Sequence, residues 1–191
     1  MNAISLLKAD HGNVDALFKE LEALRGRDEP VEKRRLVDLV IEQLSVHAAI
    51  EEQHVYPLLR ERIGDDFPVL EALEEHHGAK VFLSELEKLP ATSERFDAKV
   101  AVLIEQVRHH VEEEESELFD LLREHLKGTE LNALGEQLEE AKTTAPTRPH
   151  PMTPDQPPLQ TLIAMPVAVL DKLITTGRKA VDDARKRGRA A

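Results

Sequence analysis

Two segments of the sequence carry the same spacing of histidine and glutamate. The first reads HAAIEEQHVYPLL from His47 and the second reads HVEEEESELFDLL from His110, so a glutamate follows each histidine after four residues, at Glu51 and Glu114. The second copy lies 63 residues after the first, because 110 − 47 = 63. Residues four apart on a helix share one face. Imidazole and carboxylate together are donors for borderline and hard metal ions, so each segment is a candidate half of a metal site.

Two further histidines fit the same repeat. His11 follows an acidic residue at Asp10, and His76 follows one at Glu75, at an offset of 65 residues because 76 − 11 = 65. The chain therefore reads as one pair of helices used twice. Each pair brings one single histidine and one His-x-x-x-Glu segment.

The six candidate ligands fall on the apolar stripes of their helices. His11, for example, is in line with Leu7, Val14 and Phe18. A single histidine on such a stripe is more often a core residue, and a run of glutamates is more often a solvated face. Two unpaired carboxylates inside a bundle would cost several kcal/mol and would repel each other unless a cation lay between them. Face, spacing and repeat together favour a metal site built from facing helices.

The elements that position these residues are predicted to be helices. Apolar residues recur at spacings of three and four over residues 2–25, 30–62, 68–90 and 92–126, with a kink or local irregularity expected at Pro57. Pro30 and Pro68 suit first-turn positions. No stretch alternates with the period of a strand. Four long helices with short connections predict an all-α, up-down-up-down four-helix bundle over residues 1–127.

The remainder of the chain divides into three predicted parts. Residues 128–142 form a short helical extension, and residues 143–158 form a proline-rich linker or a strap on the bundle. Residues 159–191 form an amphipathic helix with a basic end. This helix docks on the bundle, pairs with a second copy of the chain, or contacts a membrane or nucleic acid through its basic end; docking is the preferred alternative.

Composition narrows the class of protein. The chain has 191 residues, no cysteine and 3% aromatic residues, which excludes disulfides and thiolate sites and favours helix over sheet. Residues 1–141 carry 16 Lys and Arg against 33 Asp and Glu, so nucleic acid is not an expected partner of this acidic body. No signal sequence and no transmembrane stretch is apparent, and the predicted location is the cytoplasm.

The ordered set of motifs resembles the hemerythrin-like, HHE cation-binding family. The residues that carry the resemblance are Asp10-His11, His47-x-x-x-Glu51-Glu52, Glu75-His76 and His110-x-x-x-Glu114-Glu115. The resemblance implies a non-haem di-iron centre in a four-helix bundle, with zinc as a less favoured occupant. By position it implies His11, His47, His76 and His110 as terminal ligands. Glu51 and Glu114 would bridge the two ions beside an oxo or hydroxo group.

One position departs from the oxygen-carrying hemerythrins that the set resembles. Those proteins have a second histidine one turn after the third-helix ligand, and this chain has Lys80 there. A protonated lysine cannot ligate a metal. Open positions on the metals would favour reaction with hydrogen peroxide, dioxygen or nitric oxide, including catalase-like or peroxidase-like turnover. The alternative is an oxygen-binding or iron-binding module, or an iron-responsive sensor, without turnover.

Four other residues are alternates for the site. His77 is an alternative to His76. His54 and Glu117 follow the two His-x-x-x-Glu segments by one further turn and form either a layer around the ligands or buried polar packing. Tyr56 is expected in outer packing, because it lies half a turn from Glu51; an inward position would require an irregular helix near Pro57.

Overall fold

A computed structural model gives the structure of the protein and describes residues 1–152. Every helix or strand element within these residues is a helix, which confirms the predicted all-α fold. The elements are α1 (Ala3–Ala23), α2 (Pro30–Ile50), the π-helix η1 (Glu51–Val55), α3 (Tyr56–Arg62), α4 (Phe67–Lys88), α5 (Phe96–Glu113), the π-helix η2 (Glu114–Leu118), α6 (Phe119–His125) and α7 (Gly128–Lys142).

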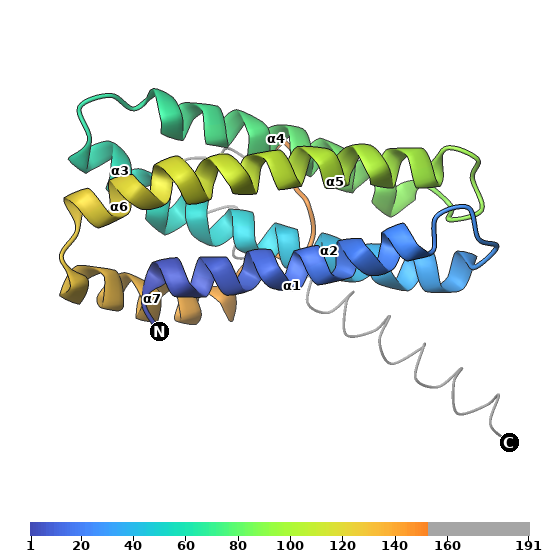
Figure 1. Ribbon diagram of the computed structural model, residues 1–191, viewed down its shortest axis with the longest axis horizontal. Coiled ribbons are helices and arrows are strands. Elements are labelled where there is room, and N and C mark those ends of the chain that lie inside the picture. The colour runs from blue at the N-terminus through green and yellow to red at the C-terminus, as the bar shows by residue number, and fades with distance from the viewer. Residues whose placement is uncertain (153–191) are drawn as a thin grey trace, which may run out of the picture.

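The long rods of the bundle lie side by side along its longest axis (Figure 1). One rod is α1, a second is α2 continued through η1 into α3, a third is α4, and a fourth is α5 continued through η2 into α6. α1 packs against α2 and α5, and α4 packs against α2 and α5, so the rods form a closed ring of neighbours. Successive rods run in opposite directions, as the short connections require.

The ends of the helices follow from local sequence. The side chain of Asn2 accepts a hydrogen bond of 2.8 Å from the backbone N–H of Ser5 and caps α1. Gly26 has φ of 74°, a left-handed conformation that glycine adopts without strain, and it lies in the turn after α1. Pro30 opens α2 and Pro68 lies in the first turn of α4, where proline removes no helical hydrogen bond.

The irregularity expected at Pro57 is a π-helical turn that precedes the proline. It spans Glu51–Val55, and Pro57 then occupies the first turn of α3. A second π-helical turn, Glu114–Leu118, contains no proline and was not expected from the sequence. Both turns begin at the repeated glutamates, but only the first is followed closely by a proline. Proline therefore does not explain both turns. Single π-helical turns inside α-helices occur frequently at functional sites.

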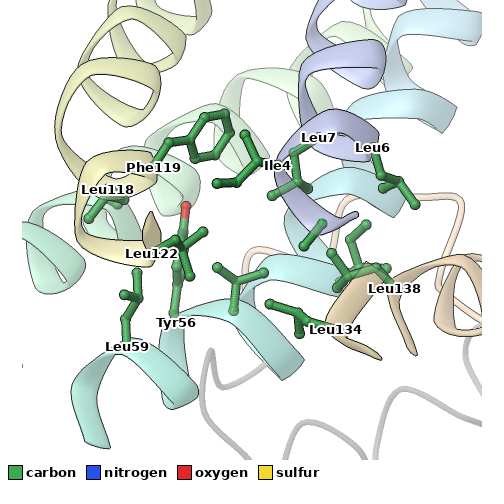
Figure 2. Close-up of a cluster of buried hydrophobic side chains, with 14 of the residues drawn as sticks. Ile4, Leu6, Leu7, Tyr56, Leu59, Leu118, Phe119, Leu122, Leu134 and Leu138 are labelled. Atoms are coloured by element: carbon green, nitrogen blue, oxygen red, sulfur yellow. The ribbon is translucent and has the colours of Figure 1, made fainter. Parts of the chain in front are cut away.

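The apolar core consists of two clusters, one toward each end of the bundle. Figure 2 shows the first, which includes Ile4, Leu7, Tyr56, Leu59, Phe119, Leu122, Leu134 and Leu138. The second includes Val14, Phe18, Leu36, Leu83, Phe96 and Leu103. The sequence positions of the six predicted ligands place them where the two clusters meet. α7 contributes Leu134 and Leu138 to the first cluster and packs against α1 and α2.

Residues 143–152 leave α7 and cross the bundle toward α4 (Figure 1). Ala145, Thr147 and Arg148 are buried, and the guanidinium of Arg148 forms an ion pair with Glu87 of α4. The rest of the predicted strap and the whole of the predicted helix over residues 159–191 lie outside the described residues. No helix among the described residues combines the length and the apolar character needed to cross a bilayer.

Candidate metal centre

Four imidazole rings from four different rods meet in the interior. Nε2 of His11 lies 3.2 Å from Nε2 of His47, and Nε2 of His76 lies 3.0 Å from Nε2 of His110. All four side chains are buried. The structure thus brings together the four histidines that the sequence singled out, and it arranges them as two pairs.

Two glutamates lie next to these two histidine pairs. Oε2 of Glu51 lies 3.1 Å from Nε2 of His47 and 3.5 Å from Nε2 of His76, so this carboxylate reaches both histidine pairs. Oε2 of Glu114 lies 3.2 Å from Nε2 of His11. Two clusters with metal-ligand spacing result, and Glu51 belongs to both. One contains His11, His47, Glu51 and Glu114, and the other contains Glu51, His76 and His110.

The two carboxylates are buried without hydrogen bonds. Glu51 is 0% exposed and Glu114 is 1% exposed, and none of their four carboxylate oxygens has a hydrogen-bond partner. The short contacts to imidazole nitrogens therefore lack hydrogen-bond geometry and resemble donors arranged around common points. Burial, reinforced by the nearby Glu114 charge, raises the pKa of Glu51 well above its ordinary value. A cation between the donors would remove this penalty, so the residues present fit a metal centre.

Two of the four imidazoles are held in the protonation state that binds a metal, whereas the pKa of His11 is raised, because the effect of burial is outweighed by contacts with Glu114 and Glu115. Burial lowers the pKa of His47 to about 4 and also lowers the pKa of His76, which keeps these two rings neutral near pH 7. A neutral imidazole offers one nitrogen lone pair to a metal ion. The Nε2 atoms, which face one another, are the atoms in position to do so.

A ring of four further carboxylates surrounds the imidazoles, and all of them except Asp10 are in hydrogen-bonding contact with an Nδ1 atom. Nδ1 of each histidine lies near one carboxylate oxygen, at 2.9 Å for His11 and Glu115, 3.5 Å for His47 and Asp10, 3.0 Å for His76 and Glu52, and 2.7 Å for His110 and Glu75. Because a carboxylate only accepts, it favours the proton on Nδ1 and leaves Nε2 for a metal. These carboxylates had no predicted role, although each recurs in the repeat directly next to a candidate ligand, and that recurrence was the available signal.

Lysine ammonium groups donate hydrogen bonds to three of these outer carboxylates. Nζ of Lys80 donates to Glu52 at 3.0 Å, Nζ of Lys8 donates to Glu115 at 2.7 Å, and Nζ of Lys142 donates to Asp10 at 2.6 Å. Lys80 is buried. Lys80 stands at the position where the oxygen-carrying hemerythrins have a further histidine, and in this chain it pairs with Glu52.

Tyr56 is directed inward, and its expected place in outer packing is wrong. The side chain is 1% exposed, and its hydroxyl oxygen lies 3.2 Å from Nε2 of His76. The π-helical turn explains the difference. Hydrogen bonds in that turn join residues five apart, so Tyr56, five residues after Glu51, returns to the same face. Phe119 follows Glu114 by the same five residues and stacks on His11 at 5.9 Å between ring centroids.

The other alternates lie outside both clusters. His77 is half-buried and belongs to neither cluster, in contrast to the neighbouring His76. His54 is half-buried, and burial lowers its pKa. Glu117 is exposed, which excludes the predicted buried layer that would contain it together with His54. The π-helical turns again account for this, because they break the four-residue line on which both predictions depended.

Comparisons with known proteins agree with this arrangement. The family model described as the hemerythrin HHE cation binding domain matches residues 2–122. A hemerythrin-like protein of Schizosaccharomyces pombe is 26% identical over 168 residues, which are 83% of each chain. A DNA nickase of Nostoc is 27% identical over 143 residues, and the match spans 75% of this chain but only 40% of the nickase.

A solved structure shares the fold. It is the crystal structure of a hemerythrin HHE cation binding domain-containing protein from Mycobacterium kansasii. The TM-score is 0.63 at 24% sequence identity, and the superposition covers 75% of this chain and 88% of the other. This likeness supports the helical bundle.

Proposed function

The chain belongs to the hemerythrin HHE cation-binding domain family, and from that premise we propose that it holds two iron ions and reacts with a small oxidant. The oxidant would be hydrogen peroxide, dioxygen or nitric oxide. The family and the two His/Glu clusters account for binding of metal cations as such. The choice of iron and the reaction with an oxidant are the proposal.

The observation that carries the proposal is the set of four buried carboxylate oxygens without partners, next to four imidazole Nε2 atoms. His11, His47 and Glu114 would hold one ion, His76 and His110 the other, and Glu51 reaches both groups. Mixed imidazole and carboxylate ligation suits iron. When bound, a pair of iron ions supplies reversible one-electron steps between the ferrous and ferric states.

The remaining residues of the site have separate tasks. For His11, His76 and His110, the outer carboxylates keep Nδ1 protonated and fix the ring orientation. Lys80 neutralises Glu52 and takes the position of a further ligand without acting as one. The hydroxyl of Tyr56 is a proton donor and acceptor within 3.2 Å of Nε2 of His76. Together these groups leave fewer ligands than an oxygen carrier has, which favours reaction over simple reversible binding.

A specific contact also favours the second candidate, a sensor without turnover. Lys142, the last residue of α7, bonds to Asp10, and Asp10 lies 3.5 Å from Nδ1 of the candidate ligand His47. A change at the metals would therefore reach an outer helix through one ion pair. DNA chemistry, suggested only by the name of the Nostoc relative, is disfavoured by the acidic charge of residues 1–141.

The test combines metal analysis, absorption and turnover on the full chain. Protein produced with abundant iron should contain two iron ions per chain. It should show an absorption band of the bound iron in the near ultraviolet, a band that bound zinc does not produce. Glu114→Gln should lower the iron content, whereas the exposed Glu112→Gln should leave it unchanged. Release of oxygen from hydrogen peroxide would support turnover. A loaded protein that consumes none of the three oxidants would favour the sensor, and a protein without iron would contradict the proposal.

A further inference from the structure

A cavity of about 540 Å³ adjoins the four imidazoles. The four candidate histidines line one part of it. Elsewhere most of its wall is apolar, with charged side chains among the lining residues, and each of the long rods contributes to it. The space within the apolar part of the wall, which we call the chamber, is lined by residues that include Val14, Phe18, Leu44, Ala79, Leu83 and Val107.

The chamber lies on one side of the centre only. Its apolar residues are one or two helical turns from the histidines, toward the second core cluster, which contains Val14 and Phe18. Toward the first cluster, Tyr56 and Phe119 are 1% and 0% exposed and contact His76 and His11. Large aromatic side chains therefore close one side, and an apolar space remains on the other.

The chamber is too large for the oxidants considered above. A water molecule takes up about 30 Å³ of liquid, and hydrogen peroxide, dioxygen and nitric oxide each contain only two heavy atoms. Protein interiors are close-packed, with few voids larger than a water molecule. The volume of about 540 Å³ lies instead in the range of roughly 300–1,000 Å³ that is typical of sites for organic ligands. An apolar wall with convergent polar groups at one place is also typical of such sites.

The charges around the chamber disfavour an anionic ligand. The exposed residues Glu71 and Glu74 contribute to its lining, as does the half-buried Glu75. Arg108, which also contributes, is neutralised by ion pairs with Asp15 and with Glu22. An acidic entrance raises the local concentration of cations and repels carboxylates.

We propose that the chamber binds the hydrocarbon group of a neutral organic hydroperoxide, with the polar end of the molecule at the four imidazoles. This inference rests on the function proposed above for the peroxide chemistry, and it narrows the oxidant to an organic one. The binding of the hydrocarbon group depends only on the chamber.

The experiment measures binding of a stable mimic to the full, iron-loaded chain. The probe is 2-phenylpropan-2-ol, the alcohol that corresponds to cumene hydroperoxide, and the readout is isothermal titration calorimetry. Ala79→Phe places a ring in the chamber, and Leu44→Phe does so from α2. Ala98→Phe, on the exposed side of α5, is the matched control. Circular dichroism establishes that each variant is folded.

We expect wild type and Ala98→Phe to bind the alcohol equally and each chamber variant to bind it at least tenfold more weakly. The anionic probe 4-(2-hydroxypropan-2-yl)benzoate should bind wild type at least tenfold more weakly than the neutral alcohol. That comparison uses the wild-type chain alone, so it remains decisive if a variant fails to fold. Ascorbate is supplied as the two-electron reductant, so that the hydroperoxide gives the alcohol and water. Under these conditions the ratio of the rates of consumption of cumene hydroperoxide and of hydrogen peroxide should fall at least tenfold in the chamber variants.

The inference is overturned if wild type does not bind the alcohol, if the anionic probe binds as tightly as the neutral one, or if folded chamber variants bind like wild type. These failures are distinct from a failure of the proposed function. Iron content and peroxide consumption without alcohol binding would overturn the chamber alone. Alcohol binding to a chain that takes up no iron would overturn the proposed function and leave the chamber intact.

Discussion

Replacing Glu51 by glutamine should stabilise the metal-free chain and impair metal binding. Both oxygens of Glu51 are buried without hydrogen bonds, and Glu114 lies close by. An unsatisfied buried polar group costs about 1–3 kcal/mol, and a charged one costs more. Glutamine has nearly the same shape, carries no charge and can donate a hydrogen bond to the carboxylate of Glu114. We therefore expect metal-free Glu51→Gln to be more stable than wild type by about 1–3 kcal/mol at pH 8.

The pH dependence has a definite sign. The folded-state pKa of Glu51 is raised above its ordinary value, mainly by burial. The folded metal-free chain therefore holds this proton more tightly than the unfolded chain, and stability falls as the pH rises above the unfolded value of about 4.3. Glu51→Gln removes that contribution, so the difference between variant and wild type should grow from pH 5 to pH 8.

The assay is urea unfolding, followed by circular dichroism, of protein that has been stripped with a chelator and of protein reloaded with iron. The exposed Glu112→Gln is the control and should match wild type in both series. Iron should stabilise wild type, because a ligand that binds only the folded state adds to its stability. Iron should stabilise Glu51→Gln less. A metal-free variant that is no more stable than wild type, or a variant that retains both metal ions with unchanged affinity, would refute the reasoning.

Three further predictions concern separate parts of the molecule. His76→Ala should lower metal affinity at least tenfold in a chelator competition, whereas His77→Ala should leave it unchanged, and equal losses would contradict the assignment. Asp97→Asn should cost about 2 kcal/mol in urea unfolding at pH 7, because it removes the negative charge that lies 2.8 Å from the buried ammonium of Lys33. Because its ion pair keeps the folded-state pKa of Asp97 low despite partial burial, the difference should shrink as the pH falls below about 4. Gly135→Ala should lower the melting temperature, because the added Cβ would approach backbone atoms at the N-terminus to within 2.8 Å or less, and an unchanged value would contradict that packing.

Much of the site was predictable because it depends on the spacing of residues within single helices. The four-residue step from His47 to Glu51, repeated from His110 to Glu114, places both donors on one helical face in any α-helix. The apolar stripes predicted the helices and the bundle for the same reason.

The position of Tyr56 was not predictable in this way. Its inward turn depends on a π-helical turn, and the same kind of turn forms at Glu114 without a proline. The stack of Phe119 on His11 joins residues 108 positions apart, because 119 − 11 = 108, and no pattern of neighbouring residues specifies such a contact.

Which residues are donors, on which face each lies, and that a helix pair is used twice could all be predicted before the structure was known, because each of these properties follows from periodicity along the chain. The tertiary structure alone decided that Glu51 reaches both histidine pairs, that Lys80 binds Glu52, and that an apolar chamber remains beside the imidazoles. The physical reason is that these features depend on the distances between helices and on how side chains from all the rods fill the space between them.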